Sequence, residues 1–266
     1  MALRDVLEIA SCTDSGIVRS FNEDSIATSP DIGLLVLADG MGGYKAGDVA
    51  SSLAINVVTR ELKQSFREEM DDGSVSRLVS DAIKNANATI YRTAHGDARY
   101  QGMGTTVVAA LFRDNQVTVA HVGDSRLYRL RNDRLDLLTH DHSLLQEQVE
   151  LGLISSEDAK VSHNRNLVTR ALGVSEAVEL DLHSEKTLPE DIYLLCSDGL
   201  NDMVDDADIE LVLISLKANL PLAARQLVMI ANDNGGHDNV SVILARVHEP
   251  EAAPQGWFSR MLGLFR

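Results

Sequence analysis

Short apolar runs alternate along the chain with stretches in which apolar residues recur every three or four positions. The continuous apolar run at 32–38 predicts a buried strand. The recurrence of apolar residues from Val49 to Leu62 predicts a helix, and a second helix is expected at about 75–94. By the same criteria, further strands are expected at 6–10, 105–112, 116–122, 126–131, 177–182, 192–196 and 240–247, and further helices at 143–151, 206–217 and 221–232.

Turn-forming residues separate the three strands predicted between 105 and 131. Asp114-Asn115 and Gly123-Asp124 lie between these strands, and Asn132-Asp133 follows the third, a pattern typical of hairpins. The strands come in blocks and the helices come in pairs. The chain is therefore expected to form an α+β fold, a β-sandwich flanked by helices, and not a regular βαβ alternation.

Two segments differ from this pattern. Residues 140–175 mix a short helix with polar, histidine-containing sequence. From 249 onward a Pro/Ala/Glu-rich linker leads to a short stretch with apolar residues on one helical face, namely Trp257, Phe258, Met261, Leu262 and Phe265. We expect one domain at 1–248 and an amphipathic tail at 249–266. The tail is a candidate for docking on a partner or a membrane surface, or for packing back on its own domain.

Composition restricts the classes of function. The 266 residues carry a net charge of −16, which disfavours binding to DNA or RNA, because phosphate backbones attract basic surfaces. Most of the acidic side chains are expected on the solvated surface. An acidic enzyme that acts on phosphate needs bound cations, which invert the sign of the local charge.

The two cysteines, Cys12 and Cys196, are too few for a disulfide framework and are typical of a reducing cytoplasm. Cys196 ends an apolar run and is expected in the core. There is no secretory signal pattern, and no run approaches the roughly 18 apolar residues that span a bilayer. A cytoplasmic domain without a transmembrane span is the expectation.

Four acidic segments lie at predicted strand ends or in tight turns. They are Asn22-Glu23-Asp24, Asp39-Gly40 after the buried strand, Asp198-Gly199 after the strand at 192–196, and Asp238-Asn239 before the last strand. A strand end holds a carboxylate rigidly, and an adjacent glycine lets a backbone carbonyl approach an ion. Mg²⁺ and Mn²⁺ favour such oxygen ligands, and a pair of these ions can activate one water molecule. Each Asp-Gly pair alone is an ordinary turn, whereas the four together predict a metal centre.

These segments belong to a longer series of motifs in one order along 11–246. The series is Arg-x-x-Asn-Glu-Asp at 19–24, Ala-Asp-Gly-Met-Gly-Gly at 38–43, Gly-Met-Gly-Thr-Thr at 102–106, His-Val-Gly-Asp-Ser-Arg at 121–126, Thr-Arg-Ala-Leu-Gly at 169–173, Leu-Cys-Ser-Asp-Gly-Leu at 195–200 and Gly-His-Asp-Asn-Val-Ser at 236–241. In this the chain resembles the type-2C metal-dependent protein serine/threonine phosphatases, the PPM family, and in particular its bacterial branch.

The resemblance implies a fold, an activity and site residues. The fold is a four-layer αββα arrangement, a central antiparallel β-sandwich with helix pairs on both faces and a flap at about 140–175 that is expected beside the substrate. The activity is hydrolysis of phosphoserine and phosphothreonine in proteins by a metal-activated water, which also implies phosphoprotein substrates and a cognate kinase. Asp39 would bridge two Mg²⁺ or Mn²⁺ ions, and Asp198 and Asp238 would complete the protein ligands of one of them. The Gly40 carbonyl and Glu23 or Asp24 would hold the other, and Arg19 would bind the substrate phosphate.

Bacterial members of the family also carry a third, looser metal. Asp124 matches a ligand position of that metal, shared with Asp198, and Asn166 in the flap is a further candidate. Eukaryotic members place a histidine, a candidate general acid, where this chain has Met41. A metal-bound water is an alternative proton donor. The other candidates are His121, His140, His142, His163 and His237, each of which is more simply interpreted as a surface or structural histidine.

Three other interpretations compete with this one. A non-catalytic phosphoprotein-binding module would be expected to lack some of the carboxylates, yet Asp39, Asp198 and Asp238 are all present. A nucleotide-binding loop at 40–47 fails because Lys45 is followed by Ala46 and not by Ser or Thr. A metal-dependent phosphatase acting on small molecules would use the same ions on a different substrate, and the large flap favours a macromolecular one.

Overall fold

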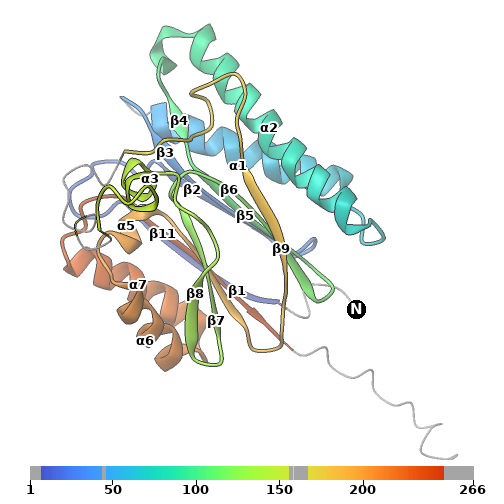
Figure 1. Ribbon diagram of the computed structural model, residues 1–266, viewed down its shortest axis with the longest axis vertical. Coiled ribbons are helices and arrows are strands. Elements are labelled where there is room, and N and C mark those ends of the chain that lie inside the picture. Colours follow the sequence, from blue (N-terminus) through green and yellow to red (C-terminus); the bar gives the residue numbers. More distant parts are fainter. Residues whose placement is uncertain (1–6, 44–45, 156–157, 159–166, 249–266) are drawn as a thin grey trace, which may run out of the picture.

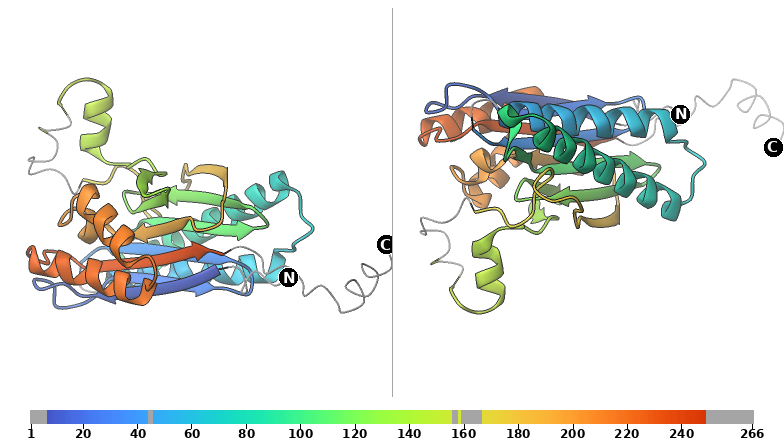
Figure 2. Two further views of the ribbon diagram at one scale, coloured as in Figure 1. Left: turned by 90° about the horizontal axis from the view of Figure 1, so that it is seen from below. Right: turned by 90° about the horizontal axis from the view of Figure 1, so that it is seen from above.

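The computed structural model of the chain describes residues 7–43, 46–155, 158 and 167–248. Two antiparallel sheets lie face to face, and a pair of helices covers the outer face of each (Figures 1 and 2). This is the four-layer α+β sandwich that the sequence predicts.

Each sheet combines strands that are far apart in the sequence. The first sheet has the order β1 (Leu7–Asp14), β11 (Val240–Val247), β10 (Ile192–Cys196), β7 (Arg126–Arg131) and β8 (Arg134–Leu137). The second has the order β2 (Asp24–Ser29), β3 (Leu34–Met41), β5 (Val107–Arg113), β6 (Gln116–Val122) and β9 (Asp181–Lys186), and β4 (Gly104–Thr105) pairs with the end of β3.

Helices cover both outer faces. Helices α1 (Ala46–Ser65) and α2 (Asp72–Gly96) pack on the second sheet, and α6 (Asp206–Leu216) and α7 (Leu220–Asp233) pack on the first. Shorter helices in the described part of the chain include α3 (Leu144–Glu150), α5 (Asp198–Asn201) and the 3₁₀ helix η2 (Ala98–Tyr100).

Three apolar layers hold the sandwich together. In β3, Leu34 and Val36 pack under α1 and α2, whereas Leu35 and Leu37 face the other sheet. Residues of β10 alternate in the same way, with Tyr193 between the sheets. Because both faces of these strands are covered, they form continuous apolar runs in place of the alternation of a half-exposed strand. Cys196 lies fully buried under α6 and α7, as expected.

The predicted central elements are confirmed, and the errors fall on sheet edges. Strands β10 and β11 have their predicted bounds, and the four long helices differ from prediction by a few residues at their ends. The strand expected at 177–182 is wrong, because β9 begins only at Asp181. Strands β2 and β8 were not predicted. The outer strands β2, β8 and β9 are polar, and an edge strand needs fewer apolar residues than a central one.

The turn at Gly123-Asp124 is not a hairpin, in contrast to the prediction. Strand β6 belongs to the second sheet and β7 to the first, so the chain crosses here from one sheet to the other. Gly123 has φ +105, and a Cβ atom on it would lie 2.6 Å from Thr106 Cγ2. The other two predicted turns do close hairpins, between β5 and β6 and between β7 and β8.

The segment after β8 leads into the predicted flap. Its helix α3 begins after Ser143, whose side-chain hydroxyl accepts a hydrogen bond from the backbone N–H of Gln146, 3.3 Å away. Figure 2 shows α3 standing away from the sandwich in both views. The tail at 249–266 and Asn166 lie outside the described residues. Among the helices that are described, none has the length and apolar character needed to cross a membrane.

One buried polar contact of the fold gives a direct test. Asn87 of α2 is 1% exposed. Its Nδ2 donates to the carbonyls of Ser175 and Glu176, and its Oδ1 accepts from Gly173 N–H at 2.8 Å. We expect Asn87→Ala to lower the free energy of unfolding by about 2–4 kcal/mol, because buried polar groups lose their partners. Urea denaturation measures the change.

The matched control for this test is Asn85→Ala on the same helix. Asn85 is exposed and its side-chain Nδ2 donates to Glu61 at the surface, so the loss of this side chain should cost less than about 0.5 kcal/mol. Equal effects of the two substitutions would contradict the structural role of Asn87.

Candidate active site

One end of the sandwich brings the predicted acidic residues together. Asp24 and Asp39 are direct partners across β2 and β3. Asp198 follows β10 and Asp238 precedes β11, and these two strands pair side by side. The cluster therefore draws carboxylates from both sheets, and Asp124 comes from the crossing between them.

Asp39 lies where β3 changes partners. Residues before it pair with β5, and Gly40 and Met41 after it pair with β4. Thr106 stands in the gap between β4 and β5, where its N–H donates to the Asp39 carbonyl and its Oγ1 accepts from Asp39 N–H, both at 2.9 Å. Asp39 thus lies inside the strand and not after its end, with its backbone fixed on both sides.

Two polar side chains join the sheets beneath the cluster. Ser197 Oγ donates to Asp24 Oδ2 at 2.8 Å and accepts from Ser241 N–H at 3.0 Å. Asn239 Oδ1 accepts from Glu23 N–H at 2.8 Å, and its Nδ2 donates to two carbonyls of the 15–21 loop. These contacts set the position of one sheet's carboxylates relative to the other's.

Gly40 is required by a close approach of two backbones. A Cβ atom on Gly40 would lie 2.2 Å from the Gly47 carbonyl oxygen and 2.5 Å from that of Glu23. The first turn of α1 and the 19–24 segment therefore reach the Gly40 backbone only because it carries no side chain. This brings Glu23 beside the predicted Gly40 ligand position.

The carboxylates of the cluster raise one another's affinity for protons. Burial raises the pKa of Asp39 well above its usual range, and the charges of Asp24 and Asp198 add to the effect. Burial likewise raises the pKa of Asp198, helped by Asp124. The pKa of Asp24 rises to about 6, mainly through burial, although hydrogen bonds from Ser241 and Ser197 oppose the shift. Without a compensating cation, burial and mutual repulsion favour the protonated forms of these carboxylates.

Some of these oxygens are also buried without a hydrogen-bond donor. Among the described residues, Glu23 Oε1, Asp24 Oδ1 and Asp198 Oδ1 are inaccessible and lack a partner. Such atoms are costly unless they are satisfied by something else. Carboxylate oxygens from several strands, mutually repulsive and unpaired, fit divalent cations such as Mg²⁺ and Mn²⁺.

Arg19 is the cation at the rim of the cluster. Its Nη2 lies 2.7 Å from Asp238 Oδ2, and its side chain is 52% exposed. The Asp238 carboxylate and hydrogen bond raise the pKa of Arg19 against the opposing effect of burial. The guanidinium is therefore held beside the acidic residues with one side open to a ligand.

A cavity of about 550 Å³ extends from the cluster to the flap. Asp124 and Asp198 line it from the sandwich, and Leu145 and Gln146 of α3 line it from the flap. Asp124 is 6% exposed, and burial followed by the charge of Asp141 raises its pKa to about 7. The structure thus places Asp124 next to the cluster, between the site and the flap.

The candidate proton donors lie in structural settings. His121 and His142 are buried, and His140 contacts Glu150 in the flap. His237 is exposed next to Asp238, and His163 lies outside the described residues. Burial lowers the pKa of both His121 and His142. The interpretation of His121, His140 and His142 as structural side chains agrees with their contacts.

Sequence reasoning missed the polar side chains that hold the carboxylates. Thr106, Ser197 and Asn239 lie inside the quoted motifs, but their side chains were assigned no role. For Ser197 and Asn239 the available signal was their position next to Asp198 and Asp238 in the sequence. Asp181, which lies against His142, stands in no quoted motif and gave no signal at all.

Comparisons with known proteins place this geometry in a family. The family described as Protein phosphatase 2C matches residues 16–227. The chain is 39% identical over 235 residues to the serine/threonine phosphatase stp of Listeria innocua, which covers 87% of this chain and 92% of that protein.

Solved structures of serine/threonine phosphatases match the fold of this chain. The structure matches Stp1, a serine/threonine phosphatase of Staphylococcus aureus, with a TM-score of 0.86 at 34% identity, over 94% of this chain and 98% of that one. It matches the catalytic domain of the phosphatase PstP in complex with two manganese ions with a TM-score of 0.81 at 37% identity, over 92% of this chain and 99% of that one. The chain therefore belongs to the protein phosphatase 2C (PPM) family and is a metal-dependent protein serine/threonine phosphatase.

Proposed function

We propose that the carboxylate cluster holds two divalent ions, Mg²⁺ or Mn²⁺, at which phosphoserine and phosphothreonine of protein substrates are hydrolysed. The observation that carries this proposal is the set of buried, unpartnered carboxylate oxygens among aspartates with raised pKa. The two manganese ions bound by the related catalytic domain of PstP support it.

The proposal assigns a ligand role to each acidic residue. Asp39 would bridge the two ions, as the family resemblance implies, and the charges of four other aspartates act on it. Asp198 and Asp238 would complete the protein ligands of one ion. The Gly40 carbonyl and Glu23 or Asp24, directly or through water, would hold the other.

The chain's own groups orient the substrate. When bound, the ions supply activation of a water molecule and stabilisation of charge on the phosphoryl oxygens. Arg19 presents a planar guanidinium at the open rim, where it suits the oxygens of a phosphate. Met41 cannot donate a proton, and we assign no described histidine to that task, so water supplies the proton to the leaving oxygen.

A third, looser ion is proposed at Asp124, shared with Asp198. Asp124 is buried, and its carboxylate lines the cavity that also contains Asp198. Asn166 is a further candidate ligand from the part of the flap outside the described residues.

The partners follow from the reaction. Substrates are phosphorylated proteins, which implies a kinase that phosphorylates them. The described cysteines, Cys12 and Cys196, are free thiols, which supports a reducing cytoplasm as the site of action. The tail at 249–266 remains a candidate for docking on a partner or a membrane surface.

Removal of the bridging carboxylate tests the metal centre directly. We expect Asp39→Asn to lower turnover of a phosphothreonine peptide with Mn²⁺ by more than about 100-fold, since even outer-shell losses cost about 10–100-fold at metal sites. EDTA should abolish the activity of the unmodified protein. Phosphate release is the measurement.

The control for the bridging carboxylate is Asp114→Asn in the hairpin between β5 and β6, a similar substitution far from the cluster, which should retain full activity. Turnover that survives chelation, or Asp39→Asn with most of its activity, would rule out the assignment.

Arg19→Ala should lower kcat/KM for a phosphopeptide by about 10–100-fold, because a charge-assisted hydrogen bond to phosphate is lost. Arg19→Lys should recover only part of this loss, since an ammonium lacks the planar fork. Steady-state kinetics provide the measurement. Arg134→Ala, an exposed arginine of β8, is the control. An unchanged kcat/KM in Arg19→Ala would remove Arg19 from substrate binding.

The raised pKa values predict how stability depends on pH without metal. Asp24 and Asp124 have pKa values of about 6 and about 7 in the folded chain, above about 3.9 in the unfolded one. The folded state therefore binds more protons, and stability is lost as pH rises through these values. In EDTA we expect Tm to fall between about pH 4 and about pH 7, the range from the unfolded to the folded pKa values. For Asp24 alone the loss corresponds to about 3 kcal/mol.

Saturating Mn²⁺ should reverse this trend, because the ions bind the deprotonated carboxylates. Asp24→Asn should reduce the fall in EDTA, since that group no longer ionises. Calorimetry across the pH range measures both effects. A metal-free Tm that stays constant from about pH 4 to about pH 7 would contradict the buried-charge description of the site.

A further inference from the structure

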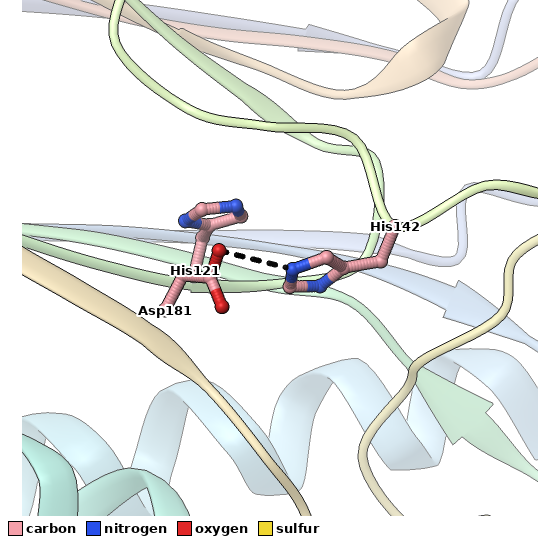
Figure 3. Close-up of side chains that lie close together, drawn as sticks. All are labelled: His121, His142 and Asp181. Atoms are coloured by element: carbon pink, nitrogen blue, oxygen red, sulfur yellow. Dashed lines mark ion pairs between the residues drawn. The ribbon is translucent and has the colours of Figure 1, made fainter. Parts of the chain in front are cut away.

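A second cluster of titratable side chains lies outside the carboxylate site. His121 lies near the end of β6, His142 precedes α3, and Asp181 begins β9 (Figure 3). The two imidazole rings are stacked, with centroids 4.9 Å apart and planes 13° apart. Both histidines are buried, at 2% and 5% exposure. This cluster has no role in the proposed reaction.

A transition-metal site is the first interpretation of these three residues. Their potential ligand atoms all lie within 4.8 Å of one another. His121 Nε2 lies 2.8 Å from the His140 carbonyl and 3.3 Å from the His140 N–H. The shorter contact favours donation by Nε2 to the carbonyl, which leaves the electron pair of the neutral ring on Nδ1. Among the described residues this Nδ1 is buried without a partner. His121 alone is therefore suited to a metal.

The hydrogen bonds of His142 contradict a metal at this place. The backbone N–H of Gly123 donates to His142 Nδ1 at 3.1 Å. A backbone N–H cannot accept, so Nδ1 holds an electron pair and the neutral ring carries its proton on Nε2. That Nε2 faces Asp181 Oδ2 at 3.5 Å, and so the electron pair that a metal would need is absent there.

Asp181 already has a cation beside it. Arg170 Nη1 lies 3.4 Å from Asp181 Oδ1 and the same distance from His142 Nε2. A divalent ion between these groups would be repelled by the guanidinium. The cluster is thus better described as a hydrogen-bonded and ionic contact that holds His142 in one orientation.

The backbone of His142 joins the same segments. Its N–H donates to the Gly123 carbonyl at 3.0 Å, and its carbonyl accepts from Thr169 N–H at 2.8 Å. Next to it, Leu144 N–H donates to the Leu167 carbonyl at 2.9 Å, so the two ends of the flap pair with each other. His142 therefore connects both ends of the flap to the turn that carries Asp124.

We propose that His142 is a positioning residue whose Nδ1 holds the Gly123-Asp124 turn against the base of the flap. In this arrangement the Asp124 carboxylate and α3 line the same cavity. The proposal rests on the proposed function in one respect, the assignment of an ion to Asp124. Loss of the Nδ1 acceptor would leave the buried Gly123 N–H without a partner, and the turn would move to satisfy it.

Two substitutions separate the two nitrogen atoms of the ring. In His142→Asn the side-chain oxygen stands near the position of Nδ1 and can accept from Gly123 N–H. In His142→Gln the polar end stands near the position of Nε2, so contact with Asp181 is kept and the acceptor for Gly123 is lost. His95→Gln, an exposed histidine of α2, is the matched control. Thermal denaturation confirms that each variant is folded.

Three measurements follow on the full chain. In His142→Gln, amide hydrogen exchange at Gly123 should be at least about fivefold faster than in the unmodified protein. Calorimetric titration with Mn²⁺ should show weaker binding of the weakest ion. KM for a phosphothreonine peptide should rise by about fivefold or more while kcat stays close to that of the unmodified protein. His142→Asn should resemble the unmodified protein in all three.

Two outcomes would overturn the proposal. The Asn and Gln variants could behave alike, in which case the Nδ1 acceptor has no positioning role. Alternatively, titration with Zn²⁺ could reveal an additional ion that is lost in both variants and in Asp181→Asn, in which case the cluster is a metal site.

A separate variant tests the part that rests on the proposed function. If Asp124→Asn leaves the number of bound Mn²⁺ ions unchanged, the assignment of an ion to Asp124 fails. The exchange rate of the Gly123 amide still decides the role of His142, because that measurement depends on neither the ion nor activity.

Discussion

The structure depends on keeping several carboxylates together at one end of the sandwich, where burial and mutual repulsion both oppose their ionisation. Taking one carboxylate out of water costs several kcal/mol unless it is paired, and here Asp39 experiences the charges of four other aspartates. Protein donors satisfy only part of the cluster, since Ser197 reaches one oxygen of Asp24 and leaves the other unpaired. The three apolar layers of the sandwich supply the rigidity that holds such an arrangement. The fold is thus complete except for the positive charge that divalent ions bring.

The same cluster also ties the two sheets to each other. Asp24 and Asp39 come from the second sheet, whereas Asp198 and Asp238 flank strands of the first. Below them, Asn239 and Ser197 bond across the same junction. Ions bound among these residues would therefore bridge the sheets, and metal affinity and stability become linked. This is consistent with the position of the candidate ligands at one end of the sandwich, where polar contacts between the two sheets do not interrupt the apolar layer between them.

The sequence was informative where apolar pattern and motif order coincide. The runs at 192–196 and 240–247 are covered on both faces, so their apolar composition alone identifies them as strands. Once these strands are identified, Asp198 and Asp238 are placed at their ends. The polar outer strands β2 and β9 gave no such pattern, because one side of an edge strand needs no apolar cover. The turn at Gly123 was mistaken for a hairpin because local sequence does not indicate that β6 and β7 lie in different sheets. The contacts of Asn239 and of His142 with Asp181 depend on tertiary proximity alone.

At Gly123 the chain crosses between the sheets, and this turn connects the carboxylate cluster of the sandwich to the base of the flap. Thr106 Oγ1 accepts from Asp39 N–H and lies 2.7 Å from Ser125 Oγ, so one side chain contacts both Asp39 and the residue after Asp124. On the other side of the turn, His142 bonds to Gly123 through its ring and its backbone. A Cβ on Gly123 would collide with Thr106, so the close approach of the turn to the sandwich requires glycine at this position. Because the turn is held by Thr106 through Ser125 on one side and by His142 on the other, the proposed positioning role of His142 would link the position of Asp124 to that of the flap base.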